Sequence, residues 1–319
     1  MLKLSMQRIL ALAALTAMSS VQSQSFPGKP VHIITAEAGS GGDVTSRLIA
    51  PGLTANLGQQ VIVENRGGHP VKSAGYVAKA TPDGYTLLLH GATVWLMPFM
   101  GDAGYDPVRD LAPITQVVSL PSVLVVNPAV PVSTVRELIA LAKTKPGELN
   151  YASGPTGSFP HLTTELFKAM TGVNILRVPY QGTGAAVNSV ISGQDQIMFS
   201  AALSVMGQVK SGRLKALAVS SAQPSALTPG LPTVAAAGVP GFEAVATLGI
   251  FAPAKTPVAV INRLYHDIVL VANDPQIKER FFAAGADVVA GTPEQFAATV
   301  KAEMERMGKV IKDQNIRAE

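Results

Sequence analysis

The chain has 319 residues, of which 47% are hydrophobic and 14% are charged, and its formal net charge is +4 at neutral pH. This composition is typical of a folded protein long enough for two domains and excludes an intrinsically disordered chain. Lysine and arginine are scattered rather than grouped with aromatic residues, so nucleic acid is not an expected partner. The absence of cysteine excludes disulfides, thiolate metal sites and a cysteine nucleophile.

The N-terminus has the pattern of a secretory signal peptide. Lys3 and Arg8 precede the apolar run 9–18, and small polar residues follow it. The run is shorter than the roughly 18 residues that a membrane-spanning helix needs. We therefore expect a signal peptide over residues 1–23, cleavage near residue 23 and an exported mature protein.

Residues 33–49 predict a strand, a loop of small residues and a helix. The loop, Gly39–Asp43, would bring backbone N–H groups together at a helix N-terminus, where unsatisfied donors and the helix dipole attract anions. An ordinary tight turn is the alternative interpretation, with Asp43 as a helix N-cap. The same pattern recurs far along the chain, where Gly154–Ser158 leads into another helix. Two such loops favour a small anionic ligand held from both sides of a cleft.

The remaining chain alternates strand and helix patterns. Further strands are expected at 61–64, 85–89, 114–118, 122–126, 173–178, 196–199, 214–219 and 248–253, and further helices around 77–79, after Thr134, at 185–191 and, three in succession, after Pro257, Asp274 and Thr292. A third small-residue loop, His90–Thr93, follows one of the strands. This alternation predicts an α/β fold with parallel sheets.

Catalytic motifs are weak in this sequence. The Gly-x-Ser-x-Gly nucleophile elbow is not met around Ser40, because position 38 is alanine. Ser158 lies three residues before His161, but no companion acid is evident, and a helix N-terminus explains both residues better. The five histidines show no metal-ligand spacing. Tyr180 is a candidate either for the core or for lining a pocket, and its place in a turn at a strand end favours the pocket. Trp95 follows a strand-end loop and could stack on a ligand, although packing in the core is the default expectation.

Several short stretches carry a resemblance to a known family. They are 26–31 (FPGKPV), 39–43 (GSGGD), 63–66 (VENR), 82–88 (PDGYTLL), 105–110 (YDPVRD), 149–153 (LNYAS), 178–182 (VPYQG), 232–234 (PTV) and 251–253 (FAP). Their number and order resemble the Bug family of periplasmic solute receptors, the TctC-like binding proteins of tripartite tricarboxylate transporters. The resemblance covers nearly the whole mature chain.

The resemblance implies a fold and a division into domains. The expected architecture is an α/β, two-domain periplasmic-binding-protein type II (flytrap) fold, with parallel or mixed sheets joined by crossover strands. The first domain would comprise residues 24–126 and a return segment, 241–319, and the second residues 127–240. Hinges would lie near 121–126 and 242–249.

The resemblance also implies a function without a reaction. The chain would be a monomeric periplasmic receptor that needs no cofactor, binds a small organic carboxylate in the interdomain cleft, and delivers it to membrane subunits of the TctA/TctB type or to a sensor. Carried over by position, the ligand-binding residues are Gly41, Gly42, Asp43, Ala92, Thr93, Gly157, Ser158, Tyr180 and Ser200. The alternative is an exported serine-dependent hydrolase that uses Ser158 and His161.

Two departures from the family pattern fall on the expected site. Thr35 and Ala36 stand where the family usually has Pro-Phe, and Ser200 stands where it usually has aspartate. The serine weakens the expectation of an amino-acid ligand, because it removes a partner for an ammonium group, whereas Glu37 could supply one.

Overall fold

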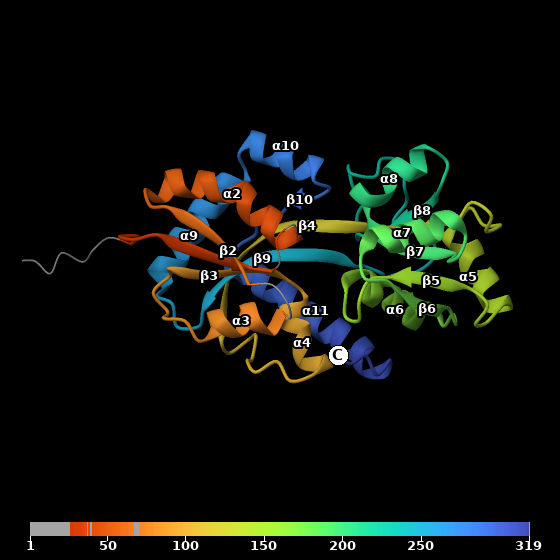
Figure 1. Ribbon diagram of the computed structural model, residues 1–319, viewed down its shortest axis with the longest axis horizontal. Coiled ribbons are helices and arrows are strands. Elements are labelled where there is room, and N and C mark those ends of the chain that lie inside the picture. Colours follow the sequence, from red (N-terminus) through yellow and green to blue (C-terminus); the bar gives the residue numbers. More distant parts are fainter. Residues whose placement is uncertain (1–25, 37, 39, 67–69, 319) are drawn as a thin grey trace, which may run out of the picture.

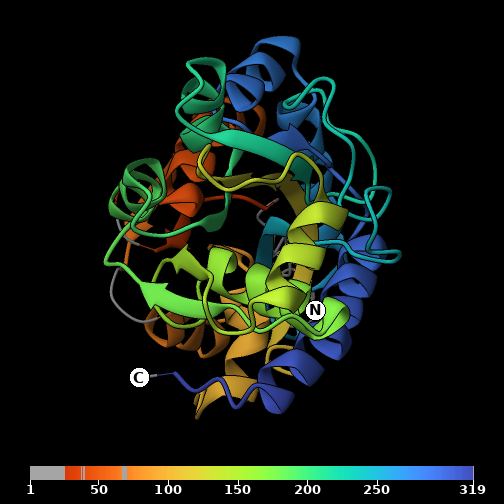
Figure 2. The same cartoon turned by 90° about the vertical axis from the view of Figure 1, so that its right-hand side faces the viewer.

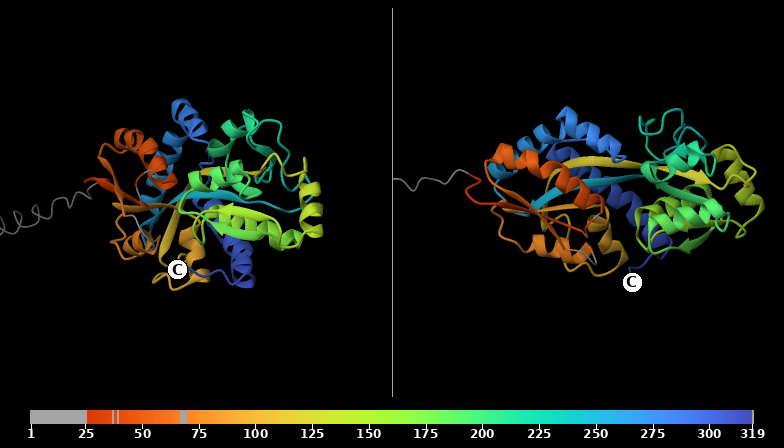
Figure 3. Two further views of the ribbon diagram at one scale, coloured as in Figure 1. Left: turned by 45° about the vertical axis from the view of Figure 1, so that its right-hand side comes forward. Right: turned by 45° about the horizontal axis from the view of Figure 1, so that its top comes forward.

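Two lobes lie side by side, and two long strands run from one to the other (Figure 1). The structure is a computed structural model that describes residues 26–36, 38, 40–66 and 70–318. The predicted signal peptide and Glu37 lie outside the described residues. In Figure 3 the two crossing strands are seen between the lobes, in yellow and cyan.

The first lobe is built on a mixed sheet. Its elements before the crossing are β1 (Val31–Thr35), α2 (Gly41–Leu57), β2 (Val61–Asn65), α3 (Pro70–Ala78), β3 (Thr86–Gly91) and α4 (Thr93–Met100). The sheet order is β2-β1-β3-β9-β4, where β4 (Leu111–Val126) and β9 (Val245–Pro253) are the crossing strands. β1 is parallel to β2 and β3, whereas β9 is antiparallel to β3 and β4. The parallel strands end on the same side of the sheet, so the loops after β1 and β3 meet there.

The second lobe contains the sheet order β4-β7-β5-β6, with β8 also on β4. Its elements are α5 (Val135–Thr144), β5 (Asn150–Ser153), α6 (Phe159–Thr171), β6 (Leu176–Pro179), α7 (Thr183–Ser192), β7 (Ile197–Ala201), α8 (Ala202–Lys210) and β8 (Lys215–Val219). β5 is parallel to β6 and β7, which places the loop after β5 at the edge facing the first lobe. Figure 2 views this lobe from its outer end.

The chain then returns to the first lobe through β9. It finishes there with α9 (Val258–Ala272), α10 (Pro275–Ala283), β10 (Asp287–Val288) and α11 (Pro293–Asp313). Thr292 caps α11 as predicted, with its hydroxyl accepting from Gln295 N and the Gln295 side chain accepting from Thr292 N. α11 packs against β4, α4 and α6, so it contacts both lobes.

β4 is one strand where the sequence predicted two. It pairs with β9 from Leu111 to Pro121 and with β7 from Ser122 onward. Pro121 therefore stands where the strand changes partners between the lobes. A proline removes one ladder hydrogen bond, which made the sequence look interrupted, but this position tolerates the loss.

Two short helices, α4 and α8, were not predicted. α4 has the sequence TVWLMPFM and lacks the polar face by which a surface helix is recognised, because five of its residues are buried. Trp95 of α4 is fully buried, with its ring 5.8 Å from that of Phe251 and 6.1 Å from that of Phe296. The core around it continues into the second lobe, where Phe167 and Phe199 belong to the same cluster of buried side chains.

Candidate functional site

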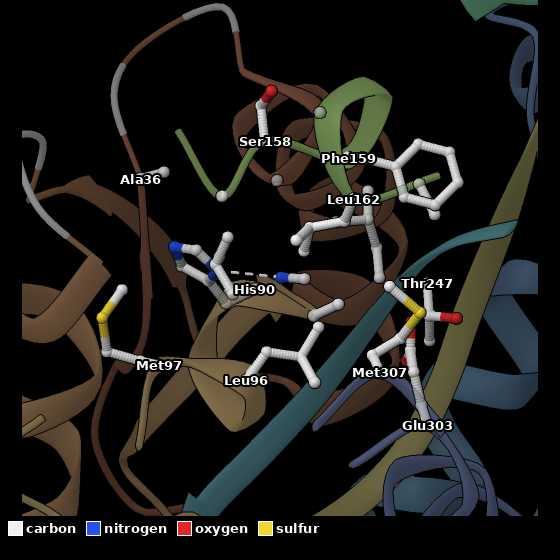
Figure 4. Close-up of a pocket in the computed structure, with 18 of the residues that line it drawn as sticks. Ala36, His90, Leu96, Met97, Ser158, Phe159, Leu162, Thr247, Glu303 and Met307 are labelled. Carbon is white, nitrogen blue, oxygen red and sulfur yellow. Dashed lines mark hydrogen bonds between the residues drawn. The ribbon is translucent and has the colours of Figure 1, made fainter. Parts of the chain in front are cut away.

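A cavity of about 690 Å³ lies between the lobes. Both lobes and α11 line it (Figure 4). The residues that form most of its wall are Ser40, Gly41, Gly42, His90, Ala92, Thr93, Leu96, Met97, Met100, Gly157, Ser158, Phe159, Leu162, Thr163, Thr247, Glu303, Arg306 and Met307. The first and second glycine loops of the sequence thus open into one space.

The first-lobe loop places the N-terminus of α2 at the cavity. Ser40 is the N-cap, and its hydroxyl accepts a hydrogen bond from Asp43 N at 3.2 Å, so Asp43 is not the cap itself. A Cβ on Gly42 would lie 2.5 Å from Thr35 Oγ1, so α2 can approach β1 this closely only with glycine there. Asn65 holds the loop by donating to Ala36 O at 2.9 Å and to Asp43 Oδ1 at 2.8 Å.

The second-lobe loop places the N-terminus of α6 at the same cavity. Ser158 is the N-cap residue, and Gly157 has φ +77, a conformation that favours glycine. Arg177 of β6 holds the loop by donating to Ser153 Oγ, Thr156 Oγ1 and Gly154 O at 2.9, 3.1 and 2.9 Å. The Arg177 side chain therefore fixes the loop, while Gly157 and Ser158 line the cavity where a ligand can reach them.

Two hydroxyls beside this loop are buried without a partner. Ser158 Oγ and Thr163 Oγ1 line the cavity, and neither makes a hydrogen bond within the described part of the chain. A buried hydroxyl that lacks a partner is destabilising by about 1–3 kcal/mol. Both groups are thus available as donors to a bound ligand.

The geometry gives the hydrolase alternative no support. His161 Nδ1 accepts a hydrogen bond from Gly157 N at 3.1 Å, and Ser158 Oγ makes no hydrogen bond to it. Burial lowers the pKa of His161 to about 4, with nearby Arg177 adding to the effect. The imidazole serves to hold the loop, and the pair lacks the contact that a nucleophile and its base require.

Sequence analysis did not identify the residues that α11 contributes to the cavity wall. Glu303 is 7% exposed, and its Oε2 accepts a hydrogen bond from Trp95 Nε1 at 3.0 Å. Burial raises the pKa of Glu303 to about 7, although the hydrogen bond from Trp95 and the charge of Arg306 act in the opposite direction. Arg306, one turn further on, also lines the cavity and lies 3.6 Å from Glu243. In the sequence, Glu303 stands among several charged residues of an ordinary amphipathic helix, so no signal singled it out.

Six of the nine residues predicted to bind the ligand line the cavity: Gly41, Gly42, Ala92, Thr93, Gly157 and Ser158. The other three lie elsewhere. Asp43 is buried against Arg47 and Asn65, Tyr180 donates its hydroxyl to Asp195 Oδ2 at 2.7 Å, and Ser200 is buried in β7 opposite Val123. None of the three is among the residues that line the cavity.

The described residues contain no cluster of three or more histidine, aspartate or glutamate side chains that could hold a metal ion. Among the helices that the structure describes, none is both long and apolar enough to cross a membrane.

Two lobes, two crossing strands and a ligand-sized cavity between βα loops define a solute-binding protein of the periplasmic-binding-protein type. The family model described as "Tripartite tricarboxylate transporter family receptor" (TctC) matches residues 45–316. The chain belongs to this family of periplasmic solute-binding receptors.

Individual relatives agree with this membership. Protein BugT of Bordetella pertussis is 34% identical over 298 residues, which cover 92% of this chain and 91% of BugT. The solved structure of R. palustris Rpa4515 with adipate is 31% identical, with a TM-score of 0.77, over 92% of this chain and 99% of that one. The periplasmic binding protein BugD is 30% identical, with a TM-score of 0.74, over 92% of this chain and 100% of that one. The predicted family and two-lobe fold are thereby confirmed.

Proposed function

We propose that this chain is a periplasmic receptor that closes on a small organic carboxylate, with the carboxylate held between the N-termini of α2 and α6. One observation carries the proposal: the two helices begin in different lobes, at Gly41 and Phe159, and both open into the same cavity. A helix N-terminus offers free N–H donors and a partial positive charge, which together favour an anion.

The unpartnered hydroxyls complete the donor set. Ser158 Oγ and Thr163 Oγ1 are ready to donate to the same carboxylate. Hydrogen bonds to a charged group contribute about 1.5–3 kcal/mol, more than those between neutral groups. The related structure with adipate supports the choice of a carboxylate over other anions.

Closure follows from a ligand that contacts both lobes. In this proposal residues 24–126 and 241–319 form one body and residues 127–240 the other, and they move about 121–126 and 242–249. A ligand favours the closed arrangement only through contacts that the open arrangement lacks. The mature receptor, exported after cleavage near residue 23, acts as a monomer and delivers its ligand to membrane subunits of the TctA/TctB type or to a sensor.

The test adds a negative charge to the second-lobe loop. Aspartate caps helices well, so Ser158→Asp keeps the N-cap of α6 but places a carboxylate where the ligand's carboxylate would lie. We expect a panel of small carboxylates to raise the melting temperature of the native protein, and the affinity of the best of them to fall by about tenfold or more in the variant.

Thr134→Asp is the matched control, because Thr134 caps α5, which lies away from the cavity. This variant should bind the same ligand with native affinity in calorimetry. Equal affinity of native protein and Ser158→Asp would overturn the proposed carboxylate position. A panel in which no carboxylate binds would overturn the function.

A further inference from the structure

The wall opposite the second-lobe loop carries a buried acid that the proposed function leaves unused. Figure 4 shows Glu303 beside Met307 at one end of the cavity and Ser158 at the other. Glu303 lines the cavity, and its Oε2 accepts a hydrogen bond from Trp95 Nε1 at 3.0 Å. A carboxyl group that is nine-tenths buried needs hydrogen-bond donors for its oxygens, and a ligand in the cavity can supply one.

One cation and one further acid lie near Glu303. Arg306, on the same helix, is the cation: its Nη1 lies 3.6 Å from Oε2 of Glu243, which precedes β9, and its buried Nε has no hydrogen-bond partner within the described part of the chain. From α4 the neighbour is the uncharged indole of Trp95. The other titratable side chains that line the cavity are His90, at the end of β3, and Arg66, which follows β2. A hydrogen-bond donor supplied from within the cavity would stabilise the carboxylate. A second anion there would be repelled in a site of low dielectric.

Between the two polar ends the wall is apolar. Leu96 and Met97 come from α4, Phe159 and Leu162 from α6, and Met307 from α11. These side chains cannot satisfy polar groups in the middle of a ligand, so the body that fits against them is hydrocarbon.

We propose that Glu303 is a specificity-determining residue that accepts a hydrogen bond from the end of the ligand remote from its carboxylate. This inference rests on the proposed function. The ligand class is then a monocarboxylate with an apolar body and a hydroxyl group, or another hydrogen-bond donor, at its far end. A dicarboxylate of the same length is disfavoured, because its second carboxylate would meet Glu303 with like charge. Selectivity of this kind comes from repulsion of the wrong ligand as well as attraction of the right one.

The experiment uses matched straight-chain ligands on the full mature protein. For chains of six, eight and ten carbons, calorimetry at pH 8 compares the ω-hydroxy acid, the dicarboxylate and the plain fatty acid. We expect the best-fitting ω-hydroxy acid to bind at least about tenfold more tightly than its dicarboxylate. In Glu303→Gln the ratio of the affinity for the ω-hydroxy acid to the affinity for the dicarboxylate should fall severalfold. The glutamine is neutral and can itself donate a hydrogen bond to the second carboxylate. Glu305→Gln, which changes an exposed acid on the same helix, should leave the ratio unchanged.

A measurement on the native protein guards against a variant that folds poorly. Lowering the pH from 8 to 6 protonates Glu303 and should narrow the discrimination against the dicarboxylate. The inference is overturned if the dicarboxylate binds the native protein as tightly as the ω-hydroxy acid, or if neither Glu303→Gln nor the lower pH changes the ratio. If plain acids, hydroxy acids and dicarboxylates all fail to bind, the proposed function itself has failed, and the inference with it.

Discussion

Single residues behind the cavity decide how its loops are presented. Neither Asn65 nor Arg177 is among the residues that line the cavity, yet each fixes one glycine loop through side-chain hydrogen bonds to it. The backbone donors at the two helix starts are thus oriented before a ligand arrives. Such preorganisation lowers the ordering cost of binding.

Glu303 makes the stability of the ligand-free protein depend on pH. Its folded-state pKa is about 7, above the ordinary value of 4.5, so the folded state binds more protons between these pH values. The contribution of Glu303 to the free energy of unfolding therefore falls as the pH rises through this window, by up to about 3 kcal/mol. We expect the difference in unfolding free energy between native protein and Glu303→Gln to show this fall in urea titrations from pH 5 to pH 8.

His161 contributes a slope of the opposite sign. Its pKa is lowered to about 4, so it favours the folded state increasingly as the pH rises from 4 toward 6.5. Because His161 is present in both proteins, subtracting the two titrations removes its contribution. A difference that is independent of pH would contradict the buried position of Glu303.

Among single residues, the sequence predicted those of the two glycine loops well and those that α11 contributes to the cavity wall poorly. Ser158 and the glycines were found because a small-residue loop before a helix is a local pattern. Glu303 reaches the cavity only because α11 packs against α4 and α6, which are more than 100 residues away in the chain. Tyr180 follows β6 and Ser200 lies within β7, and neither is among the residues that line the cavity. The ligand-binding role of the six lining residues stays a prediction.

The packing of helix α11 against strand β9 depends on one glycine, Gly249. Gly249 is buried in β9, and the ring of Phe296 occupies the place where a Cβ would be. This close approach places the Phe296 ring against β9, with its centroid 4.8 Å from that of the Phe251 ring. The helix that carries Glu303 is positioned by this contact.

Gly249→Ala should accordingly destabilise the fold by about 1–3 kcal/mol through overpacking. Gly207→Ala is the control, because Gly207 lies in α8 with no atom within 4 Å of its would-be Cβ. The control should be neutral or more stable by up to about 1 kcal/mol, since alanine favours a helix. Urea unfolding measures both, and equal stabilities would contradict the packing described for Phe296.

Most elements were predictable because their periodicity and caps are local. The exceptions have physical reasons. β4 contains Pro121 at a change of partner, which split it in the prediction, and α4 is apolar on all sides because it is buried. Residues 61–64 form a strand as predicted, but the run of apolar residues suggested that both of its faces are covered, whereas β2 lies at the edge of the sheet and only Val61 is buried. In each of these cases the outcome depends on residues that are close in space but distant in the chain, and a single sequence does not reveal such neighbours.

The whole molecule is joined across the cavity by β4, β9 and α11. A ligand that bridges the lobes should shift the population toward the closed arrangement. We expect the radius of gyration from small-angle X-ray scattering to decrease when a saturating carboxylate is added. Ser158→Asp at the same ligand concentration should show a smaller decrease, because less of it is bound. An unchanged radius with ligand fully bound would mean that the lobes do not close.

The hydrogen bond between Trp95 and Glu303 has an optical consequence. Trp95 is the single tryptophan of the chain, and its indole donates to a carboxyl group on the cavity wall. Indole emission depends on the polarity and protonation of its immediate surroundings. Filling the cavity therefore acts on one fluorophore, and the unlabelled protein carries its own reporter of occupancy.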